Sequence, residues 1–351
     1  MTVRWKTLAV NLFIIFIGLI AIELIFGGWF RKQNQLDNFN IYRNRIIYHS
    51  LNGLYDSDNE VIKYSRDNYG MRGTLAWNCP EKIDILTIGG STTDQRYITD
   101  GQTWQDVLQN EFQKQGKNFI IGNAGVDGQS TLGYIRNFEV WFPLVPNLSP
   151  KYVFFYIGIN DVLTIQSNTD YSFLNNNSFR GIKINSVLYN LGRKIQGLYL
   201  AKMVYRVAHR KIDFSQIQYV DKGTRPEEFF DSYRVDVNVG YRKRLLKLIE
   251  MTEAMGAKPV FITQPSRIYK YEKDDTMMGV EEEINGIDFY KMLSEVNRVI
   301  YEVAGNKYIV VELTELRIWN DNDFYDFMHM TPSGAQKVGF AIYEQIKDRI
   351  N

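Results

Sequence analysis

Apolar segments of strand length alternate with helical patterns from residue 83 onward, and no other feature of the chain restricts its fold as much. The candidate strands are residues 83–88, 118–122, 152–157, 258–263 and 308–312. The candidate helices are residues 103–115, 130–142, 227–255, 285–303 and 333–350. Strands that alternate with helices form a parallel sheet covered on both faces. We therefore predict an α/β fold, a three-layer sandwich around a mostly five-stranded parallel sheet.

Two helix ends carry a local signal, and one region breaks the alternation. Gly256 is well placed to end the helix over 227–255, because glycine tolerates the left-handed backbone found at helix C-termini. Thr331 and Pro332 suit the cap and the first turn of the last helix. Residues 164–225 do not follow the strand–helix pattern, so we interpret them as an insert.

The predicted insert contains apolar residues at helical spacing among basic residues. The apolar residues are Leu188, Leu191, Ile195, Leu198, Tyr199 and Val204. The basic residues are Arg193, Lys194, Lys202, Arg206, Arg210 and Lys211. One interpretation is a basic amphipathic helix that lies on anionic lipid headgroups. The other is an ordinary helix that packs on the domain and leaves a solvated basic face.

Residues 7–30 are long and apolar enough to form a transmembrane helix. Of these 24 residues, 18 are apolar. At about 1.5 Å per residue they exceed the roughly 30 Å of a bilayer core. Their Leu, Ile, Phe and Val residues contribute about −6 kcal/mol to insertion, and Glu23 costs at most about +3 kcal/mol. A cleaved signal peptide is the alternative, but the stretch is too long and no small-x-small site precedes Arg31.

These observations divide the chain into three parts. Residues 1–31 are the predicted membrane anchor, residues 32–80 a stalk that packs on the domain, and residues 81–351 the main domain with its insert. Basic residues flank both ends of the apolar segment, so charge alone determines its orientation weakly. We expect the N-terminus in the cytoplasm and the main domain outside it, in the periplasmic or extracytoplasmic space.

Composition argues against several classes of protein. The 351-residue chain has a formal net charge of +1, which gives no case for nucleic acid as a partner. Its single cysteine, Cys79, excludes a disulfide framework within the chain. It has three histidines and no CxxC or HExxH motif, which argues against a zinc site. P-loop and dinucleotide-binding motifs are also missing, so we expect neither a metal nor a cofactor.

Four short blocks carry residues suited to acyl transfer. In chain order they are Gly89–Thr93 (GGSTT), Asn123–Thr131 (NAGVDGQST), Gly158–Asp161 (GIND) and Asp326–His329 (DFMH). The hydroxyl of Ser91 is a poor nucleophile until a base accepts its proton. His329 is the best candidate for that base, since His49 lies in the predicted stalk and His209 in the insert. Asp326 can then orient the imidazole and stabilise its charged form.

In this order the four blocks resemble the SGNH (GDSL) hydrolase superfamily, over residues 66–350. The resemblance implies a flavodoxin-like three-layer fold and an acyl-serine intermediate. It also implies an oxyanion hole made by the backbone N–H groups of Ser91 and Gly128 and by the side-chain amide of Asn160. Gly125 is the second candidate for the glycine donor and suits the turn better. Asp161 is expected to cap or brace the loop of Asn160.

The chain departs from the superfamily at Gly90, where the usual motif has an acidic residue. We expect Thr92 and Thr93 to replace that residue by hydrogen bonding to the backbone of the turn.

The expected function is a membrane-anchored serine ester hydrolase, with acetyl groups on an envelope carbohydrate as the substrate. An O-acyltransferase acting on a surface polysaccharide would use the same four blocks. A lysophospholipase or thioesterase would suit the anchor and the basic insert. A non-catalytic glycan-binding or assembly module is the alternative outside enzymes. The sequence identifies no protein partner.

Overall fold

The computed structural model describes residues 2–26, 36, 41–57, 60–73, 79–165, 204–206, 211–282 and 284–351. Its contacts divide the chain into two units, which we treat separately. One unit comprises residues 1–39 and 176–204, and the other comprises residues 40–175 and 205–351. The predicted helix in the insert falls mostly on residues 188–203, outside the described part. The described residues Val204–Arg206 form a strand and not a helix, so the prediction is wrong there.

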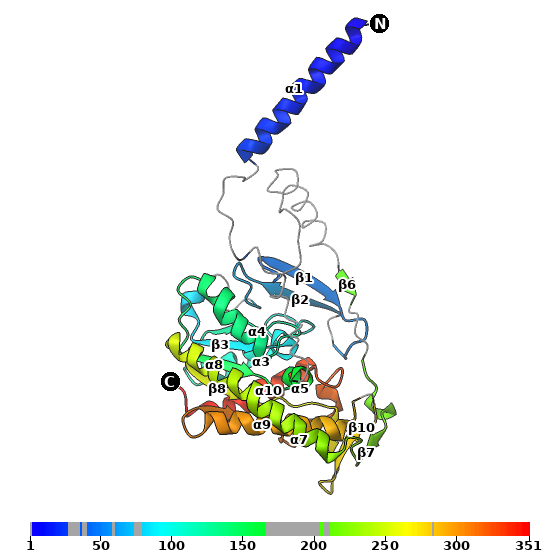
Figure 1. Cartoon of the computed structure of the whole chain (residues 1–351), viewed down its shortest axis with the longest axis vertical. Helices are drawn as coiled ribbons and strands as arrows, with labels where there is room; N and C mark the ends of the chain where they lie inside the picture. Colours follow the sequence, from blue (N-terminus) through cyan, green and yellow to red (C-terminus); the bar gives the residue numbers. More distant parts are fainter. Residues whose placement is uncertain are drawn as a thin grey trace. The chain divides into compact units, whose positions relative to one another are not determined.

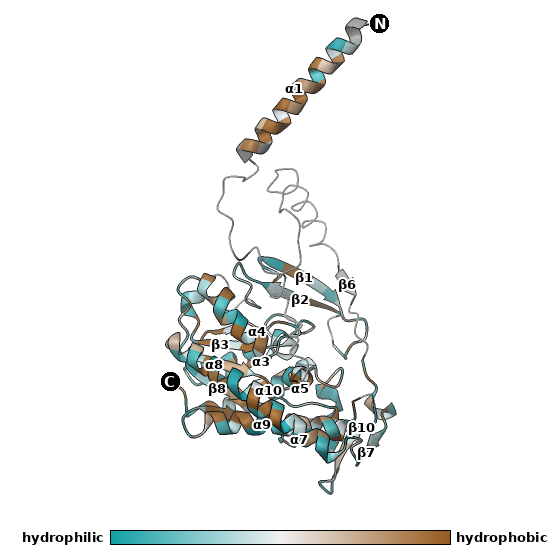
Figure 2. Cartoon of the chain, viewed as in Figure 1, coloured by the Kyte–Doolittle hydropathy of each residue, from teal (hydrophilic) through white to brown (hydrophobic). Residues whose placement is uncertain are grey.

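In the described part of the N-terminal unit the chain forms a long helix, α1 (Thr2–Phe26). Residues Trp5–Ile22 of this helix have a mean hydropathy of 2.1 and no buried share. Figure 2 shows its surface as predominantly hydrophobic. By length and composition α1 can therefore cross a membrane, in agreement with the segment predicted at residues 7–30.

The second unit is built on a five-stranded parallel sheet (Figure 1). Its strands are β3 (Ile85–Gly89), β4 (Ile121–Asn123), β5 (Tyr152–Tyr156), β8 (Lys258–Ile262) and β11 (Ile309–Val311). Their order across the sheet is β11-β8-β5-β3-β4, and every neighbouring pair is parallel. All five predicted strands are thus confirmed, and so is the α/β fold class.

Helices follow the strands on both faces of the sheet. The longer ones are α3 (Trp104–Lys114), α7 (Glu227–Asp236), α8 (Arg242–Ala254), α9 (Gly286–Ala304) and α10 (Pro332–Ile346). The shorter ones are α2 (Ser91–Asp94), α4 (Thr131–Arg136) and α5 (Ile159–Thr164). Apolar side chains of α3 and α10 pack against the apolar side chains of one face of the sheet and form one buried cluster with them. On the other side α8 packs against α4 and α9.

Two of the predicted helices are interrupted. A π-helical turn at Asn137–Trp141 follows α4, and a second one at Val237–Tyr241 separates α7 from α8. The two helix ends predicted at Gly256 and Thr331 are confirmed. Gly256 has a φ of +82°, and the side chain of Thr331 caps α10 by accepting a hydrogen bond from the N–H of Gly334.

The segment ahead of the main sheet is ordered to a degree that its sequence did not indicate. Strands β1 (Arg45–Ser50) and β2 (Val61–Arg66) form an antiparallel pair, to which β6 (Val204–Arg206) adds on the β1 side. A second small sheet has the order β7-β10-β9, made by Tyr219–Val220, Met277–Val280 and Tyr269–Tyr271. The β1–β2 pair matters here because Arg66, the last residue of β2, contacts the loop that follows β4 in the main sheet.

Candidate active site

Ser91 stands at the first position of α2, directly after β3 and two glycines. A Cβ at Gly90 would overlap the side-chain nitrogen of Asn160, and a Cβ at Gly89 would overlap the hydroxyl of Thr93. Both positions therefore exclude a side chain. A side chain at position 90 would require the side chain of Asn160 to move.

The structure brings together Ser91, His329 and Asp326, which come from opposite ends of the domain sequence. Nε2 of His329 lies 2.7 Å from Oγ of Ser91, and Nδ1 of His329 lies 2.7 Å from Oδ2 of Asp326. The other oxygen of Asp326 accepts the backbone N–H groups of Met328 and His329 at 2.9 and 2.7 Å. This continuous hydrogen-bond chain has the geometry of an activated serine.

The charges around His329 favour its protonated form. Burial alone would lower the pKa of His329, but the hydrogen bond and charge of Asp326, together with the charge of Asp127, leave that pKa raised above 6.5. Burial would raise the pKa of Asp326, but its bonds to His329 and to the backbone leave that pKa lowered. The ring of Tyr325 stacks on the imidazole with centroids 5.6 Å apart. Asp326 thus stays ionised and able to stabilise an imidazolium.

Asn160, in the first turn of α5, and Gly128, in the loop after β4, lie at the same edge of the sheet. The side-chain amide of Asn160 donates to the carbonyl of Gln129 at 2.7 Å, which uses one of its two N–H groups. Gly128 has a φ of +76°, a conformation that favours glycine and turns the loop after β4. Gly125 belongs to the same loop and stabilises it through two hydrogen bonds. Its N–H donates to Oδ1 of Asn123, and its carbonyl accepts from Arg66.

Asp161 braces α5, which carries Asn160, through the first residue of α4. Its carboxylate accepts the backbone N–H of Thr131 at 3.1 Å and the hydroxyl of Thr131 at 2.5 Å. Burial raises the pKa of Asp161, against the opposing charge of Arg244, whose guanidinium lies 3.7 Å away. Asp161 therefore ties α5 to the start of α4 and supports the Asn160 loop through that contact.

Gln129 and Asn137 form a buried amide pair that the sequence did not reveal. Nε2 of Gln129 donates to Asn137 at 3.0 Å, and Nδ2 of Asn137 donates back at 2.8 Å. The carbonyl of Gln129 accepts both Asn160 and the hydroxyl of Tyr134. Asn137 begins the π-helical turn, a type of distortion often found at functional sites. The pair fixes the carbonyl that orients Asn160.

The threonines after Ser91 do not bond to the turn backbone as expected. The hydroxyl of Thr92 accepts a hydrogen bond from Nε2 of Gln264 at 2.7 Å, and the hydroxyl of Thr93 has no hydrogen-bond partner in the structure. The turn is instead held through its carbonyls, because Gln105 and Asn123 both donate to the carbonyl of Thr93. Side chains from other elements thus hold the turn.

A buried arginine, Arg66 at the end of β2, connects both loops of the site. It is 3% exposed, and its guanidinium donates to Asp94 at 2.8 Å and to the carbonyl of Gly125 at 2.5 Å. Asp94 ends the helix that Ser91 begins. Only the position of Arg66 within the resemblance, at its N-terminal limit, could have drawn attention to it.

His49 takes no part in this hydrogen-bond chain. His49 packs edge-on against Tyr97, and burial with the charges of Arg96 and Arg72 lowers its pKa to about 4. His209 lies outside the described residues. Among the residues that the structure describes, no group of three histidine, cysteine or acidic side chains could hold a metal ion.

No protein-family model matches the chain, and a search of curated proteins finds no match. Solved structures that do match include lipolytic proteins of the G-D-S-L family and acetyl xylan esterases. A GDSL-like lipase from Bacteroides thetaiotaomicron has 15% identity and a TM-score of 0.38, covering 77% of this chain and 90% of that one. A G-D-S-L family protein from Veillonella parvula has 15% identity and a TM-score of 0.41, covering 76% and 99%. A catalytic mutant of an acetylxylan esterase from Geobacillus stearothermophilus has 15% identity and a TM-score of 0.41, covering 75% and 93%.

Proposed function

We propose that this chain is a serine ester hydrolase that acts through an acyl-serine on Ser91. The observation that carries the proposal is the hydrogen-bond chain from Ser91 through His329 to Asp326, with both heavy-atom distances at 2.7 Å. A serine hydroxyl that shares a hydrogen bond with an oriented imidazole is the arrangement needed to attack an ester carbonyl. The remaining groups act on the charge that this attack creates.

In the first half of the reaction Oγ of Ser91 bonds to the ester carbonyl carbon while Nε2 of His329 takes the hydroxyl proton. The tetrahedral intermediate collapses, the C–O bond to the alcohol breaks, and His329 protonates the departing alcohol. In the second half a water molecule gives its proton to His329 and attacks the acyl-serine. The acid leaves, and Ser91 regains its proton.

The oxyanion of each intermediate needs donors that are already in place. We assign this role to the backbone N–H groups of Ser91 and Gly128 and to the second N–H of Asn160, the first being held by Gln129. Ser91 is the first residue of α2, so its N–H lacks a partner within the helix. One such donor is worth roughly 3–4 kcal/mol in the barrier.

The substrate class follows from the expected location. In this proposal α1 anchors the chain with the N-terminus in the cytoplasm, residues 32–80 connect it to the domain, and residues 81–351 carry the chemistry outside the cytoplasm. Ester-linked acyl groups at that surface are found on envelope carbohydrates, so we propose an O-acetylated polysaccharide as the substrate. Transfer of the acyl group to a sugar hydroxyl in place of water would use the same residues.

The test compares the full-length protein in detergent with two variants, Ser91→Ala and Ser232→Ala. Ser232 is the control, because its hydroxyl donates to the carbonyl of Glu228 on the surface of α7. The wild type and Ser232→Ala are expected to label with a fluorophosphonate probe and to release acetate from a panel of O-acetylated polysaccharides. Ser91→Ala should do neither. Full activity in Ser91→Ala would overturn the mechanism. Absence of labelling in a folded wild type would instead favour a non-catalytic module, and acetylated glycan in place of free acetate would indicate a transferase.

A further inference from the structure

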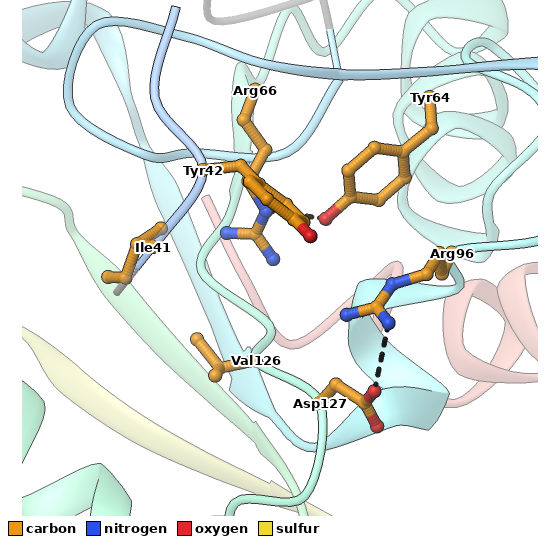
Figure 3. Close-up of a pocket in the computed structure, with 7 residues that line it drawn as sticks. All are labelled: Ile41, Tyr42, Tyr64, Arg66, Arg96, Val126 and Asp127. Carbon is orange, nitrogen blue, oxygen red and sulfur yellow. Dashed lines mark hydrogen bonds and ion pairs between the residues drawn. The ribbon is translucent and has the colours of Figure 1, made fainter. Parts of the chain in front are cut away.

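A small cavity lies against the loop that carries Gly128. Its volume is about 230 Å³, and it is lined by Ile41, Tyr42, Tyr64, Arg66, Arg96, Val126 and Asp127 (Figure 3). Val126 and Asp127 immediately precede Gly128, and the charge of Asp127 is among those that raise the pKa of His329. The cavity is therefore next to the proposed catalytic groups, and a bound molecule could extend from one to the other.

Two of the lining side chains are fixed by buried hydrogen bonds. Nε of Arg66 donates to the hydroxyl of Tyr64 at 2.6 Å, and Tyr64 donates to Asp94 at 2.9 Å. Arg66 also donates to the carbonyl of Gly70 at 2.5 Å. Arg66 and Tyr64 are 3% and 1% exposed. Because these groups are already bonded to protein, they form a rigid wall and leave recognition to the other residues.

The remaining polar residues of the cavity are at least partly exposed, and Arg96 also lies 3.8 Å from the buried carboxylate of Asp94. Tyr42 is 43% exposed, and the guanidinium of Arg45 lies 5.0 Å from its ring centroid. Arg96 and Asp127 face each other across the cavity opening at 3.2 Å, as drawn in Figure 3, with side-chain exposures of 34% and 50%. An ion pair this exposed contributes about 0–1 kcal/mol. Hydroxyl groups of a ligand can therefore replace it at little cost.

We propose that this cavity is a subsite for one sugar ring of the alcohol part of the ester, which rests on the proposed hydrolase function. The C–H face of the ring lies on the aromatic face of Tyr42, which carries a negative quadrupole. Two neighbouring hydroxyls bond to the charged pair, one accepting from Arg96 and one donating to Asp127. No change in the catalytic steps is needed.

The size and polarity of the cavity support a sugar in preference to a fatty chain. Pockets for drug-sized ligands start at about 300 Å³, so a volume of about 230 Å³ suits one ring and not an extended molecule. A long acyl chain would bury its methylenes against charged groups and lose the hydrophobic gain of roughly 0.8 kcal/mol per methylene. The subsite also gives the segment ahead of the main sheet a function, because Ile41, Tyr42, Tyr64 and Arg66 all come from it.

The experiment uses the full-length protein in detergent and two kinds of ester. The sugar esters are mono-O-acetyl methyl glucoside, galactoside and mannoside, and the small ester is 4-nitrophenyl acetate. Tyr42→Ala and Arg96→Gln are expected to lower the ratio of kcat/KM for the best sugar ester to that for 4-nitrophenyl acetate by about tenfold, mainly through KM. Tyr48→Ala is the matched control, since Tyr48 on β1 is an exposed tyrosine outside the cavity. Its ratio should equal that of the wild type.

A second readout detects the sugar without any reaction. Saturation-transfer NMR with the unacetylated methyl glycosides should show contact in the wild type and in Tyr48→Ala, and a loss of contact in Tyr42→Ala. An unchanged ratio with unchanged NMR contact in both cavity variants would overturn the subsite while the hydrolase function stands. If the wild type cleaves neither ester, the proposed function fails and the NMR comparison alone decides the subsite. Thermal melting of each variant verifies that it is folded.

Discussion

The two sides of the candidate site are held in place by different kinds of contact. On the side of Ser91 the contacts come from distant parts of the chain. The groups that bond to residues 92–94 include Tyr64, Arg66, Arg72, Trp104, Gln105, Asn123 and Gln264. Most of these side chains are almost fully buried. The position of the nucleophile therefore depends on the packing of the whole domain.

On the side of His329 most contacts are local. Asp326 accepts the N–H groups of Met328 and His329, and the N–H of Tyr325 donates to the carbonyl of His329 at 3.0 Å. Three bonds come from outside the loop: Ser266 and Arg267 donate to the carbonyl of Phe327, and the N–H of Ile212 donates to the carbonyl of Tyr325. The loop thus sets its own shape. A substitution on the local side should therefore lower activity and leave the stability of the protein almost unchanged. A substitution on the long-range side should lower both activity and stability.

The largest expected effect is on the local side. Asp326→Asn keeps the size of the side chain but cannot hold the imidazole in the tautomer that accepts a proton from Ser91. We expect kcat for 4-nitrophenyl acetate to fall by about 10⁴-fold, as in other serine triads. Because Asn retains an oxygen for the two backbone N–H groups, the melting temperature should change little. Steady-state kinetics and calorimetry on the same sample measure both quantities.

Asp323→Asn is the control for this substitution, since Asp323 caps a neighbouring turn in the same region of the chain. A loss of similar size in both variants would mean that the loop has rearranged, and the local interpretation would fail.

The next effect is on the long-range side and appears in stability. Arg66→Met removes one partner of a buried ion pair and leaves Asp94 without its closest cation. We expect the free energy of unfolding to fall by about 3–5 kcal/mol, because an unpaired buried charge is costly. Denaturant unfolding measured by tryptophan fluorescence provides this number.

Arg234→Met is the matched control, because Arg234 makes two ion pairs on an exposed helix face. Exposed pairs contribute about 0–1 kcal/mol, so this variant should unfold near the wild-type midpoint. Equal losses in the two arginine variants would contradict the role of the buried pair.

The third effect concerns Asn160, the proposed side-chain donor to the oxyanion. Asn160→Ala removes the amide that Gln129 orients, and we expect kcat to fall by about 10²- to 10³-fold with little change in KM. A rise in KM alone would show that Asn160 binds the ground state and does not act on the oxyanion. Asn238→Ala, on the surface of the π-helical turn between α7 and α8, serves as the control for removing an amide.

The same contrast explains what the sequence could reveal. The five strands were predictable because each is a short apolar run, and the Asp326–His329 pair because its spacing is local. Gln129 with Asn137 and Arg66 with Asp94 were not, since nothing in a single sequence indicates which buried polar groups far apart will meet. The π-helical turns were missed because such turns are rare and lie within segments that are otherwise helical.

The segment of residues 41–73 shows a further limit of local patterns. The β1–β2 pair has a mixed burial pattern, with exposed and buried residues on both strands, so neither strand alternates cleanly. Its order comes from side chains such as Arg66 and Arg72 that reach into the domain. The close approach of Gly90 to the side chain of Asn160 could not be predicted either, because it depends on where Asn160 lies.

The smallest effect tests the one charge that connects the two sides. Asp127 belongs to the loop beside Gly128, yet its negative charge helps to raise the pKa of His329 on the other side. His329 must be neutral to accept a proton, so activity is lost as the pH falls through that raised pKa. Asp127→Asn lowers the pKa, and the acidic limb of the kcat/KM profile for 4-nitrophenyl acetate should therefore move to lower pH, by about half a unit or less at low salt. The shift should shrink at high salt, because Asp127 is half exposed. Asp231→Asn on α7 should leave the limb in place, and a limb that also stays in place in Asp127→Asn would show that the two sides are not coupled through this charge.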